Sequence, residues 1–197
     1  MKSALALLLS ASACSAFVPA PVRQSSTKIN SVFDDYEGAV DFRGKEMKFD
    51  PLKFSESYSP FVGWFRECEI RHGRTAMLAV MGFIATDFFR LPGEMYSFEA
   101  IPKTIDAHDA LLKSGPMYQL ALWIGLWDLI ITAPAVQAIG EGEREPGDYA
   151  WYWFAPEDEA TMAKKKRAEL LNGRLAMIAV GGIATQSIVT GHGFPYV

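Results

Sequence analysis

Charged residues at matching positions of two apolar stretches are the part of this chain with the clearest chemistry. A fourteen-residue phrase runs from Glu69 to Gly82 and recurs from Glu169 to Gly182, with eight of the fourteen positions identical. Each copy places a glutamate, then a histidine or an asparagine, then an arginine in front of an uncharged apolar run. Charged side chains in a membrane helix are costly and usually functional. The repeat therefore predicts two equivalent helices that carry one kind of site.

The glutamate and the arginine of one copy are poorly placed to pair within their own helix. Their separation of five residues puts Glu69 and Arg74 about 140° apart around the helix. Two facing helices allow the pairs Glu69–Arg174 and Glu169–Arg74, which neutralise charges that would each cost roughly 2.5–3.5 kcal/mol at mid-membrane. We therefore expect a crossed, pseudo-symmetric helix pair. Small residues in both copies would let the two helices approach closely: Gly73, Ala76, Ala79 and Gly82, with Gly173, Ala176, Ala179 and Gly182.

Composition and hydropathy predict an all-α membrane protein. Half of the 197 residues are apolar, and the net charge of −4 gives no indication of a nucleic-acid partner. A membrane span needs roughly 20 mostly apolar residues. We predict three transmembrane helices near residues 64–89, 116–138 and 166–188, joined by polar loops at about 90–115 and 139–165. The basic residues 164–167 mark the side from which the third span is inserted, and Trp64, Trp151 and Trp153 fall at that edge.

After the ion pairs form, each helix still has lone pairs that could bind a metal. A carboxylate has about four lone-pair positions, and one arginine fills two of them. His72 and Asn172 each follow their glutamate by three residues, on the same outer face. Carboxylate, imidazole and amide oxygen can all bind Mg²⁺, but a free ion wants six hard ligands, which one helix cannot supply. Magnesium held in a flat macrocycle needs one axial ligand, and a neutralised carboxylate adds no net charge. The motif therefore indicates chlorophyll.

These residues resemble the light-harvesting chlorophyll-binding family. The resemblance covers about residues 49–193 and rests on the phrase Glu-x-x-His/Asn-x-Arg found twice in apolar helices. The run from Asn172 to Met177, which continues to Gly191, is especially similar to the family pattern. The first copy, from Glu69 to Arg74, is more similar to the chlorophyll a/c (fucoxanthin-chlorophyll) branch of algae than to the a/b branch of plants.

The resemblance implies a set of pigment ligands. Asp128, the only charge of the second span, stands where the family has a glutamate and has no partner evident in that span. Gln119 matches a further pigment position, although it could instead bond a neighbouring helix. The family's C-terminal helix is not expected here, and His192 could take over the ligand it carries. Chlorophyll magnesium would be bound by Glu69, His72, Asp128, Glu169, Asn172 and Gln186.

The resemblance also implies two carotenoids in the grooves of the helix pair. Met77 and Met177 would line these grooves, and the pigment ends would rest on loops such as residues 49–52, which include Asp50 and Pro51. The loop before the third span, residues 153–157, departs from the family pattern, so the second carotenoid site is less well matched than the first.

The N-terminal residues are typical of targeting segments. Residues 1–16 contain a lysine, an apolar stretch and small residues, as a signal peptide does, and residues 17–31 are basic, hydroxylated and free of acids, as a transit peptide is. This two-part address resembles that of algae with complex plastids, and an ordinary secreted protein is the alternative. Residues 32–63 would form a stromal N-terminal arm, and residues 64–197 a three-helix chlorophyll-binding domain.

We expect a multi-pass antenna apoprotein of the thylakoid membrane with its N-terminus in the stroma, and not an enzyme. It would bind chlorophyll a, chlorophyll c and a fucoxanthin- or peridinin-type carotenoid, among thylakoid lipids and other antenna proteins. It would pass excitation to a photosystem core; the plant-like third span favours photosystem I and leaves photosystem II open. A photoprotective, energy-dissipating member of the family is the alternative. A small transporter is a further one, disfavoured by the reciprocal repeat and the lack of a discontinuous helix.

Overall fold

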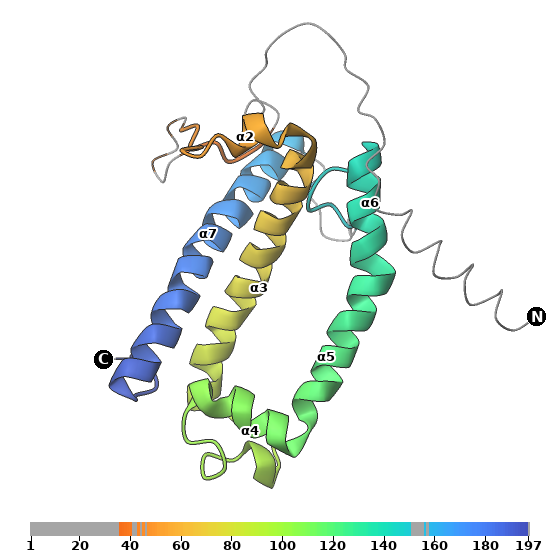
Figure 1. Cartoon of the computed structure of the whole chain (residues 1–197). Coiled ribbons are helices and arrows are strands. Elements are labelled where there is room, and N and C mark those ends of the chain that lie inside the picture. The colour runs from red at the N-terminus through yellow and green to blue at the C-terminus, as the bar shows by residue number, and fades with distance from the viewer. Residues whose placement is uncertain are drawn as a thin grey trace, which may run out of the picture.

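Three long helical stretches dominate the computed structural model, which describes residues 36–40, 43, 45, 47–150, 156 and 158–196 (Figure 1). They are α3 (Val62–Phe88), the stretch from Pro116 to Glu141, and α7 (Glu159–Thr190). No β-strand occurs among the described residues. The spans expected near 64–89, 116–138 and 166–188 correspond to these three stretches. The expected signal and transit segments, residues 1–31, and Trp151 and Trp153 lie outside the described part of the chain.

Helices α3 and α7 lie side by side and run in the same direction, and the middle stretch runs the opposite way (Figure 1). The two backbones come close together at the glycines of the repeat, where a Cβ added to Gly73 would lie 3.0 Å from the Cα of Gly173. The expectation that Gly82 and Gly182 also allow close approach is wrong, since a Cβ at either position would meet nothing within 4 Å. Nine residues turn a helix by about 180°, so these glycines face away from the contact.

The middle stretch is not one regular α-helix. It consists of α5 (Pro116–Trp127), a π-helical turn η6 (Asp128–Thr132) and α6 (Ala133–Glu141). The N–H of Ala133 bonds to the carbonyl of Asp128, five residues back. Pro134 follows directly and lacks an N–H for the carbonyl four residues before it, which explains why the regular ladder loosens here. The helix ends at Gly142, whose φ of 77° is readily adopted only by glycine.

The expected loop at 90–115 contains helical structure that the sequence reading missed. Two short 3₁₀ turns, η4 (Glu94–Tyr96) and η5 (Thr104–Asp106), precede α4 (Ala107–Ser114). Asp109 in the first turn and Lys113 in the last turn of α4 both complement the helix dipole. At the opposite end of the molecule, a short α2 (Phe54–Ser57) and a 3₁₀ turn η3 (Ser59–Phe61) lead into α3 (Figure 1).

The C-terminal residues fold back onto the end of α3. The backbone N–H of Phe194 donates to Asp87 Oδ2 at 2.8 Å, and the hydroxyl of Thr104 donates to Asp87 Oδ1 at 2.5 Å. The ring of Phe194 also packs against that of Phe88, with centroids 5.6 Å apart. One carboxylate therefore joins α3, the loop before α4 and the C-terminal tail.

Large apolar side chains lie mainly on the outside of the described residues. Leu78, Leu129 and Val189 are 76 %, 72 % and 79 % exposed, whereas Ile101 and Leu170 are among the few buried apolar residues. Two stretches, Pro116–Glu141 and Glu159–Thr190, are long and apolar enough to cross a membrane. Helix α3 does not meet that criterion, because its first half carries Arg66, Glu67, Glu69, Arg71 and Arg74. A surface this apolar indicates that lipid, pigment or protein covers it.

Candidate functional site

Two ion pairs join α3 and α7 at the repeated phrase. Arg74 Nε lies 2.6 Å from Glu169 Oε1, and Arg174 Nε lies 2.7 Å from Glu69 Oε1. These are the two pairs that the repeat predicts. They differ in detail, because Glu69 also accepts a hydrogen bond from Arg66 Nη1 at 2.8 Å, whereas both oxygens of Glu169 are bonded by Arg74. The four charges of the repeat are thus neutralised between the helices.

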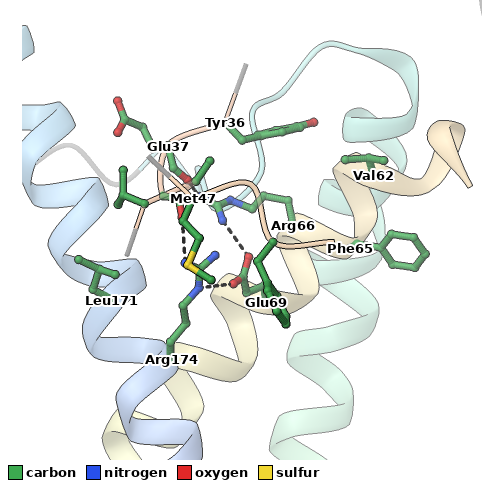
Figure 2. Close-up of a pocket in the computed structure, with 13 residues that line it drawn as sticks. Tyr36, Glu37, Met47, Val62, Phe65, Arg66, Glu69, Leu171 and Arg174 are labelled. Carbon is green, nitrogen blue, oxygen red and sulfur yellow. Dashed lines mark hydrogen bonds and ion pairs between the residues drawn. The ribbon is translucent and has the colours of Figure 1, made fainter. Parts of the chain in front are cut away.

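The N-terminal segment, residues 36–40, covers the Glu69–Arg174 pair. Arg174 Nη1 donates to the carbonyl of Gly38 at 2.9 Å, and Arg66 donates to the carbonyl of Glu37. Figure 2 shows the two arginines converging on Glu69 beneath this segment. A pocket of about 580 Å³ opens here, and its lining is mostly apolar apart from these charges: Tyr36, Glu37, Gly38, Ala39, Val40, Met47, Phe49, Val62, Phe65, Arg66, Glu69, Leu171 and Arg174.

The loop after α6 covers the other pair through Glu67, a residue the sequence reading missed. The Glu67 side chain is almost fully buried. Its oxygens accept hydrogen bonds from the Tyr149 hydroxyl at 2.6 Å and the Gly147 N–H at 2.5 Å, and Arg144 Nη2 lies 3.4 Å away. The Tyr149 ring lies against the guanidinium groups of Arg144 and Arg74, at 4.4 and 5.9 Å from its centroid. Burial and the Glu67 carboxylate raise the pKa of the Tyr149 hydroxyl.

The two covering segments are related by the same pseudo-symmetry as the repeat. Each places a glycine with positive φ, 97° at Gly38 and 84° at Gly147, over a side chain of the facing helix. A Cβ on Gly38 would clash with Leu170, and one on Gly147 would lie 2.8 Å from Ile70. Ile70 and Leu170 occupy equivalent positions of the repeat. The sequence gives little indication of this, because Gly38 and Gly147 lie far from the two copies of the repeat and at different distances from them.

His72 and Asn172 are held in equivalent ways. His72 Nδ1 lies 2.7 Å from the carbonyl of Cys68, and Asn172 Nδ2 donates to the carbonyl of Ala168 at 2.8 Å. A carbonyl can only accept, so neutral His72 carries its proton on Nδ1. The remaining atoms, His72 Nε2 and Asn172 Oδ1, make no hydrogen bond among the described residues, and both side chains are exposed. Each side chain therefore presents an outward lone pair whose direction is fixed by a second hydrogen bond, as is common for metal-binding residues.

Asp128 is not the unpaired acid that the sequence suggested. It forms an ion pair with Arg71 of α3, and Thr132 Oγ1 donates to the same oxygen, Oδ1, at 3.0 Å. The expectation was wrong because it considered partners within one span, whereas the partner lies on the neighbouring helix. The two glutamines assigned to pigment, Gln119 on α5 and Gln186 on α7, are exposed. Neither belongs to the ion-pair clusters.

The remaining candidate residues lie at the edges of this region. Asp50 accepts hydrogen bonds from the amides of Phe54 and Ser55 and from the Ser55 hydroxyl, at 3.0, 2.9 and 2.6 Å. The Ser55 hydroxyl is the main cause of a lowered pKa of the Asp50 carboxyl. Asp50 therefore orders the start of α2, and its neighbour Phe49 reaches the pocket. Pro51 is exposed, and Met77 and Met177 are half-buried on their helices. The side chain of His192 is exposed, and its backbone carbonyl and N–H are bonded to the hydroxyls of Ser187 and Thr190.

Comparison with known proteins connects this arrangement to one family. Three relatives are similar over most of this chain, and each is a chloroplastic fucoxanthin-chlorophyll a-c binding protein. That of Chattonella marina var. antiqua is 30 % identical over 97 % of this chain and 89 % of its own. That of Trieres chinensis is 33 % identical over 93 % and 92 %, and protein C of Phaeodactylum tricornutum is 32 % identical over 91 % and 92 %. Residues 36–188 match the family profile described as chlorophyll A-B binding protein, and the chain belongs to that family.

Proposed function

We propose that this chain is a light-harvesting antenna protein that binds chlorophyll a, chlorophyll c and fucoxanthin in the thylakoid membrane. The observation that carries the proposal is the matched pair His72 and Asn172, each with one polar atom bonded to its own helix and one left free. Bound pigments would absorb light and pass excitation to one another and to a photosystem core. The protein's own task is to fix their positions, and it needs no catalytic group.

The proposed ligands are the residues that the family resemblance implied. Glu69 and Glu169 can offer a lone pair each, because arginine neutralises their charge without occupying every acceptor position. Met77 and Met177 are proposed to line carotenoid grooves, with Asp50 and Pro51 in the loop beneath one pigment end. Gln119 is proposed to contact a further chlorophyll. The complete set proposed for magnesium is Glu69, His72, Asp128, Glu169, Asn172 and Gln186.

We further propose that all three long stretches cross the membrane, with α3 and α7 as a crossed pair. Helix α3 has 27 residues, about 40 Å at 1.5 Å per residue, which exceeds a hydrocarbon core of about 30 Å. Its charges are paired: Glu69 and Arg74 with α7, and Arg71 with the middle stretch. Pairing lowers the cost of placing them in an apolar medium, which is why α3 can cross despite its composition.

The proposal includes the orientation of the chain in the membrane and the removal of its N-terminal targeting segments. The exposed basic residues 164–167 at the start of α7 favour a stromal N-terminal side. Residues 1–16 and 17–31 are proposed as signal and transit peptides, residues 32–63 as the arm, and residues 64–197 as the pigment-binding domain. The plant-like third helix favours photosystem I as the recipient of excitation.

Refolding the full chain in detergent with chlorophyll a, chlorophyll c and fucoxanthin tests the function. We expect chlorophyll a emission when chlorophyll c or fucoxanthin is excited, and loss of one chlorophyll per chain in His72→Leu and in Asn172→Leu. Thr185→Leu is the matched control, because Thr185 is an exposed residue of α7 that bonds its own helix. Failure of the folded wild type to retain pigment on a sizing column would overturn the proposal.

A further inference from the structure

The ion pair between Arg71 and Asp128 joins the middle helix to α3 at an unusual point of the backbone. Asp128 is the first residue of the π-helical turn η6, and Thr132, the last residue of that turn, is buried. Their side chains are bonded to each other, and Arg71 bonds to the same carboxylate. π-Helical turns are rare and often occur at functional sites. Backbone and side chains thus single out the same carboxylate.

The repeat itself marks Arg71 as special. The equivalent position of the second copy is Leu171, which lines the pocket below residues 36–40. The two copies therefore differ at the position where the first copy meets an acid of the middle helix. The difference follows from the neighbours of α3. This helix contacts the middle stretch, where Arg71 supplies the positive charge that pairs with Asp128.

The two oxygens of Asp128 are unequal. Arg71 and Thr132 both bond to Oδ1, and Oδ2 makes no hydrogen bond among the described residues. The side chains of Asp128 and Arg71 are each 39 % exposed, so the carboxylate is reachable from outside the helix pair. Glu69 and Glu169 are also charge-neutralised carboxylates, but both oxygens of each are bonded to arginine. Asp128 differs from them because its Oδ2 has no such bond within the described part of the chain.

We propose that Arg71 is a positioning residue for a chlorophyll on the middle helix: it neutralises Asp128, bonds to Oδ1 together with Thr132, and leaves Oδ2 as the oxygen that would hold the chlorophyll magnesium. This inference rests on the proposed antenna function and deepens it. The arginine does not touch the pigment. Its contribution is that the carboxylate can ligate magnesium without a net negative charge in an apolar medium.

Two double variants that keep the net charge of the chain distinguish the ligand role of Asp128 from the effect of its charge. Arg71→Leu/Asp128→Asn keeps an amide oxygen, the ligand type proposed for Asn172, and Arg71→Leu/Asp128→Leu has none. Neither variant leaves an unpaired charge, so both should fold. After refolding the full chain with chlorophylls and fucoxanthin, we expect the Asn double variant to retain the wild-type chlorophyll count. The Leu double variant should lose one chlorophyll per chain. The absorption band of that chlorophyll should appear when the low-temperature spectrum of the variant is subtracted from that of the wild type.

The single variants test Arg71. Arg71→Leu should lose the same chlorophyll and the same band, and Arg71→Lys should largely retain them, because the lysine still supplies a positive charge. Helix content by far-ultraviolet circular dichroism is measured for every sample. A full chlorophyll count in folded Arg71→Leu, or loss of the pigment in the Asn double variant, would overturn the role of Arg71. If the wild type itself retains no pigment, the antenna function fails, and this inference fails with it.

Discussion

Gly73 and Gly173 lie back to back where α3 meets α7, and a Cβ on either would come within 3.0 Å of the other residue's Cα. Backbone contacts of this kind leave no side chain that could rotate away. We expect Gly73→Leu to force the helices apart and to cost at least the roughly 1–3 kcal/mol typical of overpacking. The change is measured as a lower melting temperature of the pigment-loaded protein, followed by visible circular dichroism.

Gly82→Leu is the matched control for this substitution. Gly82 lies on the same helix, is exposed, and would present a Cβ that meets nothing within 4 Å. Both variants carry the same change in helix propensity, so the difference between them reports the helix contact. Equal melting temperatures for the two variants would mean that the glycine contact does not hold the pair together.

Glu67 is the most deeply buried charge in the described part of the chain, with 2 % of its surface exposed. Glu67→Ala would remove the carboxylate that pairs with Arg144 and the acceptor of the Tyr149 hydroxyl. Breaking a buried ion pair typically costs about 3–5 kcal/mol, because the remaining charge is uncompensated. We expect a large fall in thermal stability and faster proteolysis of the loop at residues 142–150, both measured on the refolded protein.

Glu56→Ala supplies the comparison. Glu56 pairs with Lys53 at 3.7 Å, but both side chains are 73 % exposed. Exposed pairs contribute up to about 1 kcal/mol, so this variant should melt close to the wild type. The double variant Glu67→Leu/Arg144→Leu should be more stable than Glu67→Ala, since it removes both charges. A double variant as unstable as Glu67→Ala would show that loop packing, and not the ion pair, is the main contribution.

His72 and Asn172 should be interchangeable as ligands. Each uses one polar atom to bond the carbonyl four residues earlier and leaves another free. His72→Asn and Asn172→His should therefore retain the wild-type number of chlorophylls per chain, with shifted absorption bands because the ligand atom changes. Pigment extraction and quantification test this. A loss in His72→Asn equal to that in His72→Leu would show that the amide cannot replace the imidazole there.

Some of this arrangement could be predicted from the sequence, and the reason lies in the repeat. Two copies of Glu-x-x-x-x-Arg fix both the angular positions and the signs of the charges, which leads directly to the pairs Arg74–Glu169 and Arg174–Glu69. The approximate positions of the three long helices follow from apolar runs. The first seven residues of α7 were missed because Glu159, Lys164 and Lys165 interrupt their apolar pattern. Asp158 starts that helix by accepting a hydrogen bond from the Thr161 N–H at 2.9 Å.

Contacts between distant, non-repeated residues could not be predicted in this way. Arg71 and Asp128 are 57 residues apart, and Glu67 and Tyr149 are 82 residues apart. The pattern within one helix does not say which neighbour each face meets. The π-helical turn at Asp128 depends on Pro134 together with the packing of the middle helix, so its local sequence signal is weak.

Tyr196 gives the fold a dependence on alkaline pH. The residue is 5 % exposed, and burial together with the nearby Asp87 carboxylate raises the pKa of its hydroxyl to about 12. An unfolded tyrosine ionises near pH 10. Below pH 10 both states keep the proton and the free energy of unfolding is unaffected by this group. Between pH 10 and 12 the unfolded chain releases its proton first, so stability falls by up to roughly 2–3 kcal/mol.

Thermal unfolding of the refolded protein between pH 9 and pH 12, followed by far-ultraviolet circular dichroism, measures this fall. Tyr196→Phe keeps the ring that packs against Phe194 but cannot ionise, so its melting temperature should decline less steeply over this range. Tyr58→Phe is the control, because Tyr58 is 51 % exposed and should leave the wild-type slope unchanged. If the melting temperatures of Tyr196→Phe and the wild type fall equally over this range, the folded C-terminal tail does not keep Tyr196 protonated. The contact between the tail and Asp87 would then depend on the Phe194 amide and not on Tyr196.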